Sequence, residues 1–277
     1  YSPAMNRRGG PILLYHGVAE CGGDAIRDPL YSLPRGAVLA QIARLAARGG
    51  GSVTLAEYLA RGGACAGACV ITIDDGLASA AECLFPALLR AGLKAAVFPV
   101  AGMVGRRGWL SWGDLSEMLR AGFEVGSHGM THANLATAAP GEAREELAGS
   151  KKLLEDRLGA PVRYLSLPGG YRGPATSDLA AEAGYEAVCG SRFGYNRLPP
   201  DRFDLRRFCL RAGDGGAGAI DRIMAGAFWP LAARYLAEGG KTAGRRLLGG
   251  RIYSALRRRM VPAGAHTTLP RFRRNGG

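Results

Sequence analysis

Short apolar runs alternate with longer stretches of helical periodicity through most of this 277-residue chain. The apolar runs cover residues 11–15, 69–73, 95–100, 123–125 and 163–167, and the helical patterns cover residues 38–47, 78–89, 112–119, 141–158 and 176–183. Because each run is apolar almost throughout, it is typical of a parallel strand that is covered on both faces. The alternation therefore predicts a β/α barrel or a doubly wound sheet.

Residues with reactive side chains follow several of these runs at the same end. His16 closes the first run, Asp74 and Asp75 close the second, and His128 follows the fourth. The fifth run is followed by Pro168-Gly169-Gly170. In β/α barrels the active site lies at the carboxyl ends of the strands, where the βα loops converge. The pattern therefore predicts one shared active-site face.

Two of these positions carry residues that suit a metal ion. Asp74-Asp75-Gly76 ends one apolar run, and Ser127-His128-Gly129-Met130-Thr131-His132 places two imidazoles four residues apart after another. One carboxylate and two imidazoles form a mixed oxygen and nitrogen site that suits zinc, with positions left for water and substrate. Taken singly, the Asp pair could cap a helix and the His pair could lie in a surface turn. Together and in this order they indicate a metal-dependent hydrolase.

At these motifs the sequence resembles the NodB-homology polysaccharide deacetylases, which are metal-dependent amidases of N-acetylated sugars with a distorted β/α barrel. The likeness covers residues 10–212. Thr72-Ile73-Asp74-Asp75-Gly76 is similar to the family's first motif, in which the first Asp is the general base and the second is a metal ligand. The segment from His128 to His132 is similar to the second motif, which supplies two further ligands. The resemblance thus implies that Asp75, His128 and His132 bind zinc, or another divalent transition metal, beside Asp74.

The resemblance also implies a role for the loop that follows the fifth apolar run. The family's third motif maps to this loop, where a backbone N–H near Gly169 would stabilise the tetrahedral oxyanion together with the metal. We therefore expect Pro168, Gly169, Gly170 and Tyr171 to form an oxyanion and substrate loop.

Two departures from the family pattern leave catalytic groups to be found elsewhere in the chain. The third motif of the family has an Arg that orients the base, and this chain has Ser166 at that position. Arg207, on a predicted last strand at residues 204–210, is our candidate for the missing positive charge, with a surface salt bridge as the alternative. The C-terminal motif that brings the general acid is absent. Because His266 lies in a polar, proline-flanked tail, His16 is our candidate acid, with a hydrogen bond inside the first loop as the alternative.

The positive charge of the chain is concentrated towards its C-terminal end. Residues 222–277 hold 12 Lys and Arg and one acidic residue, and so carry +11 of the net charge of +13. We predict a deacetylase-like barrel over residues 1–212 and a basic, partly helical extension over residues 213–277, which begins at a glycine-rich stretch. The extension suggests peripheral contact with an anionic membrane. Its few aromatic residues speak against a nucleic acid partner.

The six cysteines show no disulfide framework in their spacing. Cys69, Cys83, Cys189 and Cys209 lie inside apolar runs, where thiols commonly pack as small apolar groups. No signal peptide is visible at the start of the sequence. These observations predict a cytoplasmic protein, which the basic extension could bring to the inner membrane face.

Three functions are compatible with these motifs. The first is a zinc-dependent hydrolase that removes N-acetyl groups from an amino sugar in a polysaccharide, an oligosaccharide or a lipid-linked glycan. The second is a metal-dependent amidase that acts on a non-sugar amide, because the motifs of the metal site cannot separate the two substrates. The third is a non-catalytic glycan-binding relic, which the absence of the usual Arg and acid suggests and the presence of both Asp and both His residues opposes.

Overall fold

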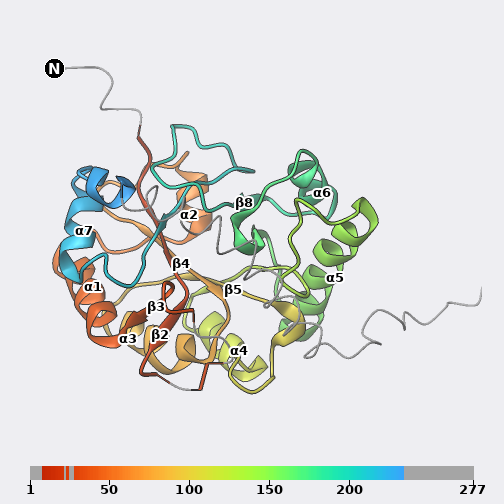
Figure 1. Ribbon diagram of the computed structural model, residues 1–277, viewed down its shortest axis with the longest axis horizontal. Coiled ribbons are helices and arrows are strands. Elements are labelled where there is room, and N and C mark those ends of the chain that lie inside the picture. The colour runs from red at the N-terminus through yellow and green to blue at the C-terminus, as the bar shows by residue number, and fades with distance from the viewer. Residues whose placement is uncertain (1–7, 22, 25–27, 234–277) are drawn as a thin grey trace, which may run out of the picture. The chain divides into compact units, whose positions relative to one another are not determined.

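The computed structural model describes residues 8–21, 23–24 and 28–233, with strands at the centre and helices around them (Figure 1). The strands are β1 (Ile12–Tyr15), β2 (Gly17–Ala19), β3 (Ser32–Pro34), β4 (Val70–Asp75), β5 (Ala96–Pro99), β6 (Glu124–Val125), β7 (Tyr164–Ser166), β8 (Ala187–Cys189) and β9 (Phe208–Cys209). The α-helices are α1 (Arg35–Ala47), α2 (Leu55–Ala60), α3 (Phe85–Arg90), α4 (Trp112–Arg120), α5 (Pro140–Leu158), α6 (Thr176–Glu182) and α7 (Ala217–Met224). A π-helical turn, η2 (Ala80–Leu84), precedes α3, and two 3-10 turns, η3 (Ala101–Met103) and η4 (Pro168–Gly170), follow β5 and β7.

The strands form a nearly closed ring. Five parallel strands pair in the order β6-β5-β4-β1-β9, and β7 and β8 form a second parallel pair. Isolated parallel bridges join the two sheets, between Ser127 and Leu165 on one side and between Cys189 and Leu205 on the other. Because Leu205 lies just before β9, the ring returns to the strand at the edge of the first sheet. The predicted distorted β/α barrel is therefore confirmed, and a doubly wound sheet is not formed.

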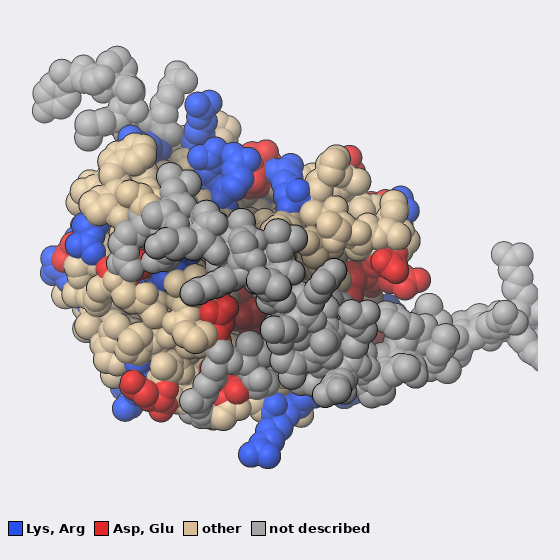
Figure 2. Space-filling view, in the orientation of Figure 1, with Lys and Arg blue, Asp and Glu red and all other residues tan. Residues whose placement is uncertain are grey.

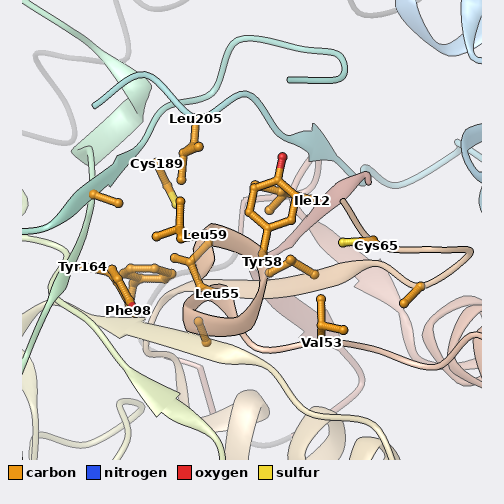
Figure 3. Close-up of a cluster of buried hydrophobic side chains, with 14 residues drawn as sticks. Ile12, Val53, Leu55, Tyr58, Leu59, Cys65, Phe98, Tyr164, Cys189 and Leu205 are labelled. Carbon is orange, nitrogen blue, oxygen red and sulfur yellow. The ribbon is translucent and has the colours of Figure 1, made fainter. Parts of the chain in front are cut away.

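Apolar side chains fill the end of the barrel at which the strands begin. Figure 3 shows Leu55 and Leu59 of α2 in one cluster with side chains from the strands. Ile12 of β1, Phe98 of β5 and Tyr164 of β7 belong to the same cluster. Burial of one such side chain contributes about 1.5–3 kcal/mol, so this end is a packed core. The opposite end, where the strands finish, is left to the loops that carry the predicted site.

The limits of the main helices follow from local sequence. The Ser111 hydroxyl caps α4 by accepting a hydrogen bond from the Asp114 N–H, and the Asp114 carboxylate accepts one from the Ser111 N–H. Thr54 and Glu57 form the same reciprocal cap on α2. α5 ends at Gly159, which adopts φ 62°, a left-handed conformation that favours glycine. These signals agree with the predicted starts and ends of the helices at residues 112–119 and 141–158.

The compact unit that contains the barrel extends to Phe228. The domain boundary after residue 212 stays a prediction. The glycine-rich stretch is a tight turn, in which Gly213 and Gly215 have φ of 90° and 84°. This turn leads into α7, which packs against α1. Gln41 of α1 donates to the Gly215 carbonyl at 3.3 Å. Residues 234–277 of the predicted basic extension, with His266, lie outside the described residues.

A disulfide joins Cys21 to Cys83, and this corrects the prediction that Cys83 is a free thiol. The two cysteines are 62 residues apart in sequence, but β1 and β4 are neighbours in the sheet. The segment after β2 and the turn η2 after β4 therefore meet at the same end of the barrel. The other four cysteines are free and buried, as predicted. Because disulfides are typical of oxidising environments, the cysteine argument for a reducing compartment is weakened.

Charged residues of both signs are spread over the described surface. Figure 2 shows Lys and Arg gathered along the upper edge of one face and Asp and Glu at several places on it. Among the described helices, none combines the length and the apolar character that crossing a bilayer requires.

Candidate active site

The structure brings Asp75, His128 and His132 together at the end of the barrel where the strands finish. Nε2 of His128 lies 3.4 Å from Oδ1 of Asp75, and Nε2 of His132 lies 3.5 Å from the same oxygen. One ligand atom from each residue lies within 4.8 Å of the others. Three donors at this spacing can contact one common ion.

Local backbone geometry turns the side chain of Asp75 towards the two imidazoles. In a regular strand, successive side chains point to opposite faces, so Asp74 and Asp75 would diverge. Asp75 instead has φ 68° at the end of β4, and Gly76 follows with φ 79°. A Cβ on Gly76 would lie 2.8 Å from Cα of Pro99, so this position requires glycine. The Asp-Asp-Gly sequence is therefore a geometric requirement of the site.

A hydrogen bond fixes which nitrogen of His128 faces the site. Nδ1 of His128 lies 2.8 Å from the Ser166 carbonyl oxygen, which can only accept a hydrogen bond. In the neutral ring the proton is therefore on Nδ1, which leaves the Nε2 lone pair available to a metal ion, whereas Nε2 of the protonated ring can donate to Asp75. His128 is 2% exposed, whereas the side chains of Asp75 and His132 are each 21% exposed. The site is thus open on the side of Asp75 and His132.

The charges around Asp75 favour its ionised form. Burial alone would raise the pKa of Asp75, but hydrogen bonds from His128 and His132 hold it well below its usual range. For His128, burial lowers the pKa, and the nearby Asp74 and Asp75 carboxylates outweigh it, so the pKa is raised. An ionised carboxylate and two imidazoles match the ligands that zinc prefers in sites that keep positions open. The residues present therefore fit a divalent transition metal.

Asp74 is buried beside this group in a network with Arg207 and Ser166. Nη1 and Nη2 of Arg207 donate to the two oxygens of Asp74 at 2.9 and 2.8 Å. The Ser166 hydroxyl donates to Asp74 Oδ2 at 2.8 Å and accepts from Arg207 Nη2 at 2.9 Å. Arg207 is 1% exposed, so a surface salt bridge does not describe it. The Ser that stands at the family's Arg position is thus one of the partners of Asp74.

Two further contacts hold the Arg207 guanidinium in place. Its Nε donates to the Gly190 carbonyl at 2.7 Å, and its Nη1 donates to the Thr72 hydroxyl at 3.2 Å. Sequence reasoning missed Thr72 as part of this network. The signal was present, because Thr72 is a polar residue within an apolar run and lies two positions before Asp74, on the same face of β4.

The network decides the charge of Asp74. Burial alone would raise its pKa, but the Arg207 guanidinium outweighs burial and the pKa is lowered. Burial likewise would lower the pKa of Arg207, and Asp74 raises it above its ordinary value. Asp74 is therefore an ionised carboxylate fixed in orientation by two parallel hydrogen bonds.

His16 lies at the end of β1, next to β4 in the sheet. Tyr15 is paired with Ile73, so His16 follows in register with Asp74. Its Nδ1 is buried and has no hydrogen-bond partner among the described residues. Burial lowers the pKa of His16, and this outweighs the opposing influence of Asp75 and Asp74. The centroid of its ring lies 4.8 Å from the ring centroid of Tyr31, a neighbour that the sequence did not indicate.

The loop predicted to bind the oxyanion and the substrate lies directly after β7. Pro168 is buried, whereas Tyr171 is 38% exposed at the surface. The N–H of Gly170 donates to the Leu167 carbonyl at 2.8 Å and is already engaged in the turn. Gly169 and Gly170 have φ of 63° and 70°, and a Cβ on Gly170 would collide with the side chain of Ser191. The two glycines therefore permit a turn that brings the chain close to Ser191.

Comparison with known proteins relates this geometry to one family. The family model described as polysaccharide deacetylase matches residues 62–188. This segment is similar to the polysaccharide deacetylases. The resemblance predicted from the motifs is confirmed, and the match includes Asp74, Asp75 and both predicted His ligands. His16 and Arg207 lie outside the matched residues.

Individual relatives agree with the family match. The chain is 28% identical over 211 residues to the protein YxkH of Bacillus subtilis, and this alignment covers 75% of this chain and 73% of YxkH. It is 30% identical over 122 residues to a peptidoglycan-N-acetylglucosamine deacetylase of Bacillus cereus, and this alignment covers 44% of this chain and 55% of the relative. The fold matches that of the Streptococcus pyogenes deacetylase PplD with a TM-score of 0.70 at 19% identity, over 79% of this chain and 99% of PplD.

Proposed function

We propose that this chain is a metal-dependent hydrolase that removes N-acetyl groups from an amino sugar in a glycan. The observation that carries the proposal is the convergence of Asp75, His128 and His132 beside an ionised Asp74, within a segment that is similar to the polysaccharide deacetylases. The Bacillus cereus relative, whose name gives a peptidoglycan N-acetylglucosamine substrate, supports a substrate of this class.

Zinc is the ion that we propose for the site, since a carboxylate and two imidazoles suit it. Asp75, His128 and His132 would hold it. When bound, such an ion polarises a carbonyl oxygen and lowers the pKa of a water molecule, which an unreactive acetamide requires. The hydrogen bond from His128 Nδ1 to the Ser166 carbonyl orients one of these ligands before any ion arrives.

Asp74 is the proposed general base. Its carboxylate is ionised, and it is near the three donor atoms without being part of their group. A lowered pKa reduces the basicity of a carboxylate, but fixed orientation compensates because the proton acceptor needs no reorganisation during the reaction. We assign Arg207 to this orientation, so it acts through Asp74 as a positioning residue.

His16 is the proposed general acid. His16 follows β1, which pairs with β4, so it lies near the Asp74 and Asp75 carboxylates at the end of β4. In its protonated form it would donate a proton to the leaving sugar amine. We further propose that the loop of Pro168, Gly169, Gly170 and Tyr171 contacts the substrate, with a backbone N–H near Gly169 for the oxyanion.

The experiment that tests the function is acetate release from a panel of N-acetylated glycans and simple amides. The protein is first treated with a chelator and is then assayed with and without added zinc. Zinc-dependent acetate release from a glycan supports the proposal. Release from simple amides alone would favour a non-sugar amidase, and zinc binding without release from any substrate would favour a glycan-binding relic.

A second experiment tests the ligand assignment directly. Asp75→Ala and His128→Ala should each abolish stoichiometric zinc binding, because each removes one of three ligands. Asp178→Ala is a matched control, since Asp178 is an exposed carboxylate on α6. Full zinc occupancy in either ligand variant would contradict the assignment.

Membrane contact through the basic segment at residues 222–277 remains part of the proposal, as does a location at the inner membrane face. The Cys21–Cys83 disulfide speaks against a reducing cytoplasm. Flotation with vesicles that contain anionic lipid, compared with neutral vesicles and with a variant truncated before residue 234, tests the contact. Labelling of thiols in intact and fractionated cells tests the compartment.

A further inference from the structure

The short segment between the two histidine ligands has its backbone groups bound on both sides. The N–H of Met130 and the N–H of Thr131 each donate to Glu146 Oε2 at 2.9 Å. The Gly129 carbonyl accepts from Ala101 N at 3.0 Å, and the Met130 carbonyl accepts from Gly102 N at 2.9 Å. The segment is therefore fixed by α5 through its donors and by η3 through its acceptors.

Glu146 projects from α5 and is 7% exposed. Besides the two backbone amides, its carboxylate accepts a short hydrogen bond from the hydroxyl of Thr131 through Oε1. Three donors from two adjacent residues therefore converge on one buried carboxylate. Hydrogen bonds to a charged acceptor are roughly twice as strong as neutral ones, and leaving such donors buried without a partner is costly.

A second residue of α5 supports the start of the same segment. Ser150 lies one helical turn after Glu146, so both face the same side of α5. The Ser127 hydroxyl donates to the Ser150 hydroxyl at 2.8 Å, and the N–H of Gly129 donates to Ser127 Oγ at 3.1 Å. α5 thus contacts the chain before His128 and between the two ligands.

The shape of the segment leaves little freedom. Gly129 has φ 75°, and a Cβ there would lie 3.1 Å from Glu146 Oε2. His132 has φ 64°, a left-handed conformation that costs a residue with a side chain about 1–3 kcal/mol unless its surroundings hold it. The ligand that closes the site is therefore in a conformation that depends on the contacts of the preceding residues.

We propose that Glu146 is a positioning residue for the metal site, which sets the spacing between the imidazoles of His128 and His132. This inference rests on the proposed metal-dependent function. The hydrogen bonds of the Glu146 carboxylate go to Met130 and Thr131, which lie between the two histidine ligands. Glu146 acts by binding Met130 and Thr131, so that His132 reaches the position where its Nε2 lies 3.5 Å from Asp75 Oδ1 before an ion binds.

Three variants separate this role from a general effect on folding. Glu146→Ala removes all three hydrogen bonds, and Glu146→Gln keeps one oxygen for the two amides and an NH2 group that can donate to the Thr131 hydroxyl. Glu145→Ala is the matched control, because Glu145 is the preceding residue of α5 and is exposed. Thr131→Val removes one hydrogen bond without changing the carboxylate, and serves if Glu146→Ala does not fold.

The first measurement is the dissociation constant for zinc, obtained by competition with a chromophoric chelator. Loss of groups that orient metal ligands typically costs about 10- to 100-fold in affinity, and we expect this loss for Glu146→Ala. We expect a smaller loss for Glu146→Gln and for Thr131→Val, and a value within about twofold of wild type for Glu145→Ala. The visible spectrum of the cobalt-substituted protein should change in Glu146→Ala, which a loss of stability elsewhere would not produce.

The second measurement uses the metal-free protein and so does not depend on the proposed function. Amide hydrogen exchange at Met130 and Thr131 should accelerate in Glu146→Ala and stay unchanged in Glu145→Ala. If wild-type protein binds no zinc, the proposed function fails while the exchange result still tests the hold of Glu146 on the segment. The positioning role is overturned if the wild-type protein binds zinc and Glu146→Ala binds it with the same affinity and the same cobalt spectrum. If Glu146→Ala does not fold, the same result for Thr131→Val overturns the role.

Discussion

Replacement of Arg207 by Met should change both the stability of the protein and the charge of Asp74. Arg207 is 1% exposed and donates to the two oxygens of Asp74 at 2.9 and 2.8 Å. Removal of one partner from a buried ion pair costs about 3–5 kcal/mol, because the other charge is left without compensation. We therefore expect Arg207→Met to lower the free energy of unfolding by about 3–5 kcal/mol near neutral pH.

The pH dependence of that loss has a defined sign. In the wild type the pKa of Asp74 lies below its unfolded value of about 3.9, so its contribution to stability is present above that pH and is lost as the pH falls through the folded pKa. Without Arg207, burial would raise the folded pKa above the unfolded one. The variant should then lose stability as the pH rises from about 4 towards the raised pKa, by up to about 1.4 kcal/mol per pH unit.

Urea unfolding in the presence of a chelator measures this effect, from about pH 5 to about pH 7. The double variant Arg207→Met with Asp74→Asn is the control, because it lacks the titrating carboxyl and keeps every other group. The difference in pH slope between the two variants isolates Asp74. Equal slopes would refute the reasoning, since they would mean that Arg207 does not determine the ionisation of Asp74.

Three further predictions concern other parts of the fold. His16→Gln should lower kcat by about 100-fold or more and remove one limb of the pH–rate profile, and an unchanged profile would mean that the acid lies elsewhere. Replacement of both Cys21 and Cys83 by Ser should lower the free energy of unfolding by about 4 kcal/mol, because a loop of 62 residues is no longer closed in the unfolded chain; the same unfolding midpoint in both proteins would contradict this. Gly76→Ala should weaken zinc binding and destabilise the fold by at least about 1–3 kcal/mol, as its Cβ would lie 2.8 Å from Cα of Pro99, and wild-type affinity would show that the turn can relax.

The parts of the fold that could be predicted are those encoded locally. Parallel strands are apolar throughout, and helix caps lie within a few residues of the helices that they begin, so the alternation of elements is visible in sequence. α2 was not predicted, because Leu55–Ala60 is short and its apolar residues are explained only by the barrel end that they fill. The disulfide was missed for a related reason, since the neighbouring strands β1 and β4 alone bring Cys21 to Cys83.

The candidate site could be outlined from sequence because chemistry at strand ends follows a simple rule of topology. That rule placed Asp74 and Arg207 at the same end, and the structure brings them together in a bidentate pair. It could not reveal that Ser166 contributes a hydroxyl to the pair, because this depends on β7 meeting β4 across the barrel. It also gave no sign of Glu146, whose contact with Thr131 depends on the packing of α5.

The apolar cluster around α2 gives the two ends of the barrel different roles, with a packed core at one end and the candidate site at the other. Leu55 and Leu59 fill the core end in a cluster that includes none of Asp74, Asp75, His128 and His132. A library built to alter substrate preference can therefore leave that end fixed and vary only the connections that follow the strands, such as residues 169–175 and 190–204. The unchanged apolar end would keep the barrel stable, while the loops at the opposite end are varied to change substrate selectivity.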